Sequence, residues 1–99
     1  MMSTLENLIK ELENNGPQDL VKKSPSHLEF NLNGKEITFI ENYAPKDEGT
    51  NKSIYSYYLL VNSNGSFEDF KVQENNSEDK VNYEALKGYF ESLSKKAKN

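Results

Sequence analysis

Residues 27–43, HLEFNLNGKEITFIENY, decide the fold of this chain. Polar and apolar residues alternate on both sides of Asn33-Gly34, the dipeptide that best fits a two-residue type I′ turn, because both of its residues take positive φ. A two-residue loop places Leu32 opposite Lys35 and thereby fixes every other pair of the hairpin. The apolar residues expected on its shared face are Leu28, Phe30, Leu32, Ile37 and Phe39.

Two more strands are predicted after this hairpin. Alternating and β-branched residues indicate a third strand at 54–61 and a fourth at 67–73, with a turn at 62–66 between them. The segments 44–53 and 74–79 are polar and rich in turn-forming residues, so we expect loops there.

Helices are predicted at both ends of the chain. Ser3 and Glu6 have the spacing of a capping box, an apolar stripe follows, and Asn-Asn-Gly-Pro at 14–17 ends the first helix. Residues 17–23 are expected to add one short helical turn. Apolar residues at three- and four-residue spacing predict the last helix over about 82–96.

The 99 residues are sufficient for one small domain, and no internal repeat divides them. We therefore predict a single α+β domain over residues 1–99. Its expected architecture is an antiparallel three- to four-stranded meander flanked by an N-terminal and a C-terminal helix, in the order α-β-β-β-β-α.

The composition argues against several classes of function. The chain has twelve lysines, no arginine, no cysteine and one histidine, His27. Disulfides and thiolate metal sites are excluded, and arginine, the usual bidentate reader of guanine and phosphate, is missing. His27 has no nucleophile motif beside it in the sequence, so we expect an ordinary edge or surface histidine. No enzyme activity, catalytic residue, metal or cofactor is predicted.

Targeting signals are also missing from the sequence. The N-terminal segment is amphipathic and carries acidic residues, unlike a secretory signal, and no stretch has the length of apolar residues that a membrane span needs. The excess of Asn and Lys over Arg is typical of an AT-rich genome. We expect a cytoplasmic protein of bacterial or viral origin that binds neither membrane nor nucleic acid directly.

The third predicted strand is apolar on both faces, which suggests an interaction surface. One face lines the core, and the other groups either Tyr58 and Leu60, or Tyr55 and Tyr57, with Ile40. Tyrosine is amphipathic and enriched at interfaces. The alternative is that this is simply the central strand, with one helix covering each face. If both helices pack on one side, a partner or a second copy must cover the patch.

Acidic residues concentrate in the middle of the chain. Residues 41–84 hold nine carboxylates and four lysines, a local charge of −5. Such carboxylates can imitate a row of phosphates and occupy the basic groove of another protein, with charge steering the encounter. Improved solubility is the alternative reading.

The expected function is that of a non-catalytic protein-binding module: an inhibitor, adaptor or chaperone that acts through a tyrosine-rich sheet face and an acidic rim. Phage anti-defence inhibitors and secretion chaperones include proteins that it resembles in size, charge and element order. Its expected partner is another protein, with a basic nucleic-acid-binding protein and a second copy as candidates. The alternative is a small-molecule binder or minor enzyme with a pocket between sheet and helices. The predicted partner-binding residues are Ile40, Tyr43, Tyr55, Tyr57, Tyr58, Glu68 and Asp69.

Overall fold

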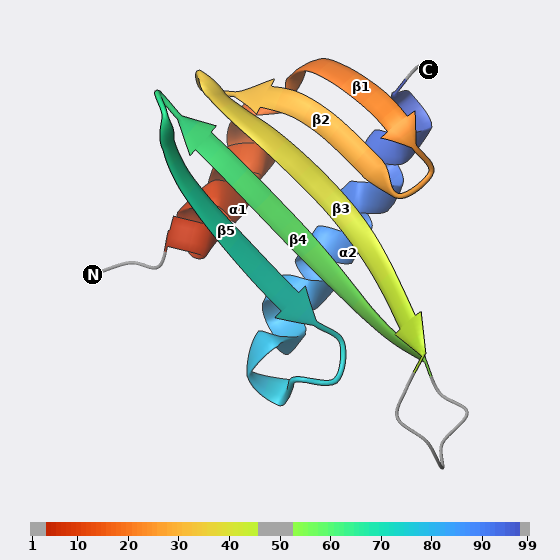
Figure 1. The fold of residues 1–99 in the computed structure, drawn as a ribbon. Coiled ribbons are helices and arrows are strands. Elements are labelled where there is room, and N and C mark those ends of the chain that lie inside the picture. The colour runs from red at the N-terminus through yellow and green to blue at the C-terminus, as the bar shows by residue number, and fades with distance from the viewer. Residues whose placement is uncertain (1–3, 46–52, 98–99) are drawn as a thin grey trace.

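The computed structural model describes residues 4–45 and 53–97, and it confirms an α+β fold with one antiparallel sheet between an N-terminal and a C-terminal helix (Figure 1). The sheet has five strands in the order of the sequence, each paired with the next. The elements are α1 (Thr4–Asn15), β1 (Gln18–Ser24), β2 (His27–Leu32), β3 (Lys35–Pro45), β4 (Ser53–Ser63), β5 (Ser66–Gln73), a 3-10 turn (Ser77–Asp79) and α2 (Lys80–Lys96).

The central hairpin has the predicted register. Leu32 pairs with Lys35, and the remaining pairs of β2 and β3 follow without a bulge. Asn33 and Gly34 have φ of 52° and 81°, as a type I′ turn requires. The side chain of Asn31 also accepts a hydrogen bond from the Gly34 backbone N–H at 3.0 Å.

A second hairpin repeats this arrangement between β4 and β5. Asn64 and Gly65 have φ of 52° and 87°, and Ser63 pairs with Ser66 across the turn. The side chain of Asn62 accepts a hydrogen bond from the Gly65 backbone N–H at 2.9 Å. The sequence Asn-x-Asn-Gly therefore sets the register of both hairpins.

The prediction of three to four strands was wrong, because the sheet has five. Residues 18–24 form the edge strand β1 rather than a helical turn. Asp19 takes a positive φ of 57°, which a helix does not allow, and β2 offers these residues a free edge for backbone hydrogen bonds. The pairing of β1 with β2 is irregular on both sides of Val21 and Lys22. Two bulges of this kind obscure the strand periodicity in the sequence.

The helix boundaries differ slightly from the expected ones. Ser3, the predicted cap of the first helix, lies outside the described residues. The last helix begins at Lys80, two residues earlier than predicted. Asn76 caps the preceding 3-10 turn by accepting from the Glu78 backbone N–H, while Asp79 stands at the start of α2 without a capping hydrogen bond.

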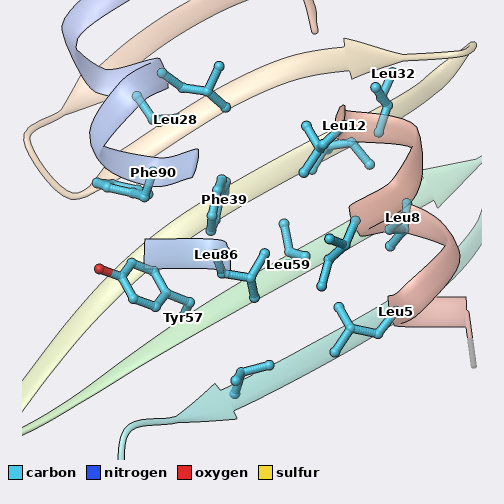
Figure 2. Close-up of a cluster of buried hydrophobic side chains, with 14 of the residues drawn as sticks. Leu5, Leu8, Leu12, Leu28, Leu32, Phe39, Tyr57, Leu59, Leu86 and Phe90 are labelled. Carbon is cyan, nitrogen blue, oxygen red and sulfur yellow. The ribbon is translucent and has the colours of Figure 1, made fainter. Parts of the chain in front are cut away.

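Both helices lie on the same face of the sheet, and the core is enclosed between them and the strands. Figure 1 looks onto the opposite face, with α1 and α2 behind the sheet. In Figure 2, Leu8 and Leu12 of α1 meet side chains of the sheet and of α2 in one apolar cluster. Neither helix covers the other face, so the alternative of one helix on each face is wrong. The buried apolar residues are Leu5, Leu8, Ile9, Leu12, Leu28, Phe30, Leu32, Ile37, Phe39, Tyr57, Leu59, Val61, Val72, Tyr83, Leu86, Phe90 and Leu93.

Candidate functional site

The face of the sheet without helices, here called the open face, carries a strip of apolar side chains across its three longest strands. Ile40 of β3 pairs with Tyr58 of β4, Leu60 follows two residues along β4, and Phe67 of β5 lies diagonally beyond it. We call these four residues the open-face strip. Ile40 and Tyr58 are half-buried, whereas Leu60 is 40% and Phe67 is 76% exposed. Large exposed apolar side chains that adjoin one another are typical of interaction surfaces.

Charged side chains surround the strip. Glu36 and Asp69 stand on the open face by register, and Lys71 lies with its ammonium 5.6 Å from the centre of the Tyr58 ring. On β2, Glu29 lies on the same face and contacts the Nε2 of His27 at 3.0 Å. Glu29 also forms an ion pair with Lys23 of β1, at 3.9 Å. The described part of the open face therefore combines an apolar centre with a charged border of three carboxylates and two lysines.

The structure divides the seven predicted partner-binding residues between the two faces. Ile40, Tyr58 and Asp69 lie on the open face, whereas Glu68 points to the helix side of β5. The other three, Tyr43, Tyr55 and Tyr57, share the helix side of the sheet. Of the two groupings considered for the third strand, the structure thus places Tyr58 and Leu60 with Ile40. Tyr57 is 1% exposed and belongs to the core, so its ring is not part of any exposed surface.

A second candidate site is a cleft of about 240 Å³ between the sheet and α2. Tyrosine and glutamate side chains supply most of its lining, and one lysine completes it. We call it the tyrosine–glutamate cleft; its lining residues are Glu41, Tyr55, Tyr57, Glu74, Tyr83, Lys87 and Glu91. They come from β3, β4, the segment after β5, and α2, so the cleft forms only when the whole fold is assembled.

Hydrogen bonds fix two sides of this cleft. The Tyr57 hydroxyl donates to Glu41 at 2.7 Å, and the Tyr55 backbone N–H donates to Glu74 at 3.3 Å. In Figure 2 the Tyr57 hydroxyl points away from Leu86, so the ring packs in the core while its polar end faces outward. The rings of Tyr57 and Tyr83 lie side by side, with 5.4 Å between their centres.

The cleft has a negative potential. Burial raises the pKa of Tyr83 to about 12, and the carboxylates of Glu74, Glu84 and Glu41 contribute to this rise. The pKa of Tyr57 is raised further, by burial first and then by the hydrogen bond to Glu41. Both shifts have the same consequence, because each hydroxyl keeps its proton where an unfolded tyrosine would lose it near pH 10.

The difference in tyrosine pKa between the folded and the unfolded protein predicts a loss of stability in alkali. Between pH 10 and 12 the folded protein binds more protons than the unfolded chain, so the free energy of unfolding falls as the pH rises. Tyr83→Phe removes one of the two hydroxyls. Over this pH range, we expect the free energy of unfolding of the variant to fall by up to about 2 kcal/mol less than that of the wild type. Urea unfolding at pH 8, 10 and 11.5 measures the difference. Equal losses in both proteins would contradict the assignment of the raised pKa to Tyr83.

Other kinds of site find little support in the described ranges. Within 4–45 and 53–97, no three His, Asp or Glu side chains are arranged to hold a metal ion. Neither α1 nor α2 has the length and apolar character that crossing a membrane requires. Of the nine carboxylates in the acidic middle of the chain, those at 41 and 74 line the cleft, the one at 68 lies on the helix side of β5 and the one at 69 lies on the open face.

Sequence reasoning missed Phe67 as a member of the open-face strip. The second Asn-Gly turn contained the signal, because a two-residue loop at 64–65 places Phe67 opposite Asn62 and hence on the face of Leu60. It also missed the roles of Tyr83 and Glu91. No local pattern could reveal these, since they meet Tyr57 only through the packing of α2 on the sheet.

A comparison of the chain with protein-family models, with curated proteins and with solved structures finds no match.

Proposed function

We propose that this protein is a non-catalytic protein-binding module that holds its partner on the open face. The observation that carries the proposal is the position of both helices on one side of the sheet, which leaves the open-face strip uncovered. An exposed apolar centre within a polar border is the usual anatomy of a protein interface. Tyr58, half-buried among its neighbours, has the properties of an interface anchor.

The charges favour a partner of different chemistry over a second copy. The chain has a net charge of −4, and the open face carries Glu29, Glu36 and Asp69 against two lysines, Lys71 beside Tyr58 and Lys23 at 3.9 Å from Glu29. A second copy would bring the same carboxylates to the interface, whereas a partner with an apolar patch bordered by lysine or arginine would complement them. An inhibitor, adaptor or chaperone role is consistent with such a surface.

The test is a double variant, Ile40→Ser with Tyr58→Ser, studied in the complex isolated from the native host. We expect the variant to retain the partner at least tenfold less well, because two facing apolar side chains at the centre of the interface are truncated. Val81→Ser is the matched control, since Val81 is an apolar residue of α2 that is 81% exposed and lies away from the sheet.

Circular dichroism and sedimentation velocity complete this experiment. Unchanged circular dichroism with lost association supports the proposal. An unfolded double variant would show that Ile40 and Tyr58 belong to the core, and undiminished binding would show that the partner docks elsewhere. Sedimentation of the isolated wild type as a stable dimer would assign the open face to a second copy.

The alternative of a small-molecule site between sheet and helices keeps one observation in its favour. The tyrosine–glutamate cleft lies at this place in the fold, and three of its seven lining residues are tyrosines.

A further inference from the structure

We propose that the tyrosine–glutamate cleft binds an organic cation, namely a guanidinium or alkylammonium group at the end of an aliphatic stem. The inference concerns the helix side of the sheet and deepens the small-molecule alternative, but it is independent of partner binding by the open face. A free amine or guanidine and the side chain of a partner's arginine or lysine share this chemistry.

The first observation is the combination of rings and carboxylates. Tyr55, which is 37% exposed, supplies accessible aromatic surface, whereas the rings of Tyr57 and Tyr83 line the cleft but are almost fully buried. Glu41, Glu74 and Glu91 supply negative charge around the same space. Cations with a diffuse charge are attracted both to the face of an aromatic ring and to carboxylates. The three carboxylates are not arranged to ligate one metal ion, so the cleft suits a larger cation.

The second observation is that, within the described residues, no cation forms an ion pair with these carboxylates. Lys87 lines the cleft, but no ion pair within 4.0 Å joins it to Glu41, Glu74 or Glu91 in the described structure. Among the residues that the structure describes, the donors to Glu41 and Glu74 are the Tyr57 hydroxyl and the Tyr55 backbone N–H, both uncharged. The lining therefore carries three carboxylates against the one ammonium of Lys87, a net negative charge that a bound cation would reduce.

The third observation is the Tyr83 hydroxyl. Tyr83 is 4% exposed, yet its hydroxyl has no hydrogen-bond partner among the described residues. No fully buried side-chain oxygen or nitrogen in this part of the chain lacks a partner, so this hydroxyl is not fully buried, and Tyr83 is one of the residues that line the cleft. An acceptor held there by a buried ring is suited to an N–H donor of a ligand.

The cavity also has a suitable size. About 240 Å³ is small for a drug-sized molecule but sufficient for a guanidinium group with part of its stem. The negative potential of the site, which contributes to the raised pKa of Tyr83, adds to the attraction for a cation.

The experiment is a titration with arginine amide, followed by chemical shifts of the backbone amides. Both probes are used with the α-amino group acetylated, so that the guanidinium is the only charge of arginine amide. Citrulline amide is then the matched probe, because it has nearly the same shape with a neutral urea group in place of the guanidinium. We expect shifts concentrated at residues of the cleft, a dissociation constant on the order of 1 mM or below, and at least tenfold weaker binding of citrulline amide. Binding should also weaken as sodium chloride is added.

Glu74→Gln with Glu91→Gln tests the carboxylates without removing hydrogen-bond acceptors. This double variant should bind arginine amide about tenfold more weakly, whereas Glu68→Gln, on the exposed part of β5, should bind it as the wild type does. Equal binding of arginine and citrulline amides, an unchanged affinity of the double variant, or shifts confined to another surface would overturn the proposal.

Two further probes distinguish the sources of the cation. Tighter binding of spermidine than of the blocked tripeptide acetyl-Gly-Arg-Gly-amide would assign the cleft to a free amine. Tighter binding of the tripeptide would assign it to a side chain on a partner protein. Because these shifts arise on the helix side of the sheet, their absence would leave the test of the open face unaffected.

Discussion

The Phe39→Ala variant is expected to lose about 3–5 kcal/mol of stability, which is most or all of what a small domain has. Phe39 is 0% exposed and lies at the centre of the core, where it makes edge contacts with Phe30, Tyr57 and Phe90. Removing the ring leaves a cavity between the sheet and α2 that the surrounding side chains cannot fill. Urea unfolding followed by circular dichroism measures the loss.

Phe67→Ala is the matched control, because it makes the same chemical change on the other face of the same sheet. Phe67 is largely exposed, so its removal should change the free energy of unfolding by no more than about 0.5 kcal/mol. A stable Phe39→Ala variant, or equal losses in the two variants, would mean that the core does not lie between the sheet and the two helices.

The second large effect is expected from Leu60→Lys, which should weaken binding of the partner rather than destabilise the fold. Leu60 is the middle of the open-face strip, and a lysine placed there would bring an ammonium into the apolar centre of the interface, at a desolvation cost of several kcal/mol that the facing Asp69 offsets only in part. We therefore expect binding of the partner to weaken at least a hundredfold. In the free protein the ammonium would stand in water across from Asp69, so stability should change little.

Val81→Lys serves as the control for added charge. It introduces the same lysine at an exposed apolar position of α2, and partner affinity should stay within twofold of the wild type. Isothermal titration calorimetry with the partner isolated from the native host provides both affinities. If Leu60→Lys binds as tightly as Val81→Lys, Leu60 does not lie in the interface.

The sheet could be predicted from the sequence where local rules determine it. Asn33-Gly34 fixes a register in which every apolar residue between Leu28 and Phe39 faces the same way, and that register is the observed one. The edge strand β1 could not be predicted in this way. Its bulges and the positive φ of Asp19 depend on pairing with β2, and no local pattern in residues 18–24 encodes that pairing.

The candidate site shows the same limit. Alternation along β4 predicts that Tyr57 and Tyr58 lie on opposite faces, but it cannot decide which face the helices cover. That depends on how α1 and α2 pack together against the sheet, a tertiary choice that leaves Tyr58 half-exposed and Tyr57 buried. The tyrosine–glutamate cleft depends on the same choice, because Tyr83 reaches Tyr57 only when α2 lies on that side.

The most direct test of the open face as the binding surface is site-specific photo-cross-linking in the native host. Leu60→p-benzoylphenylalanine places a reactive group in the open-face strip, and Val81→p-benzoylphenylalanine places it on the exposed surface of α2. If the open face is the interface, position 60 gives one covalent adduct, with a single partner protein, and position 81 gives none. The same adduct from position 81 alone, or from both positions equally, would contradict it.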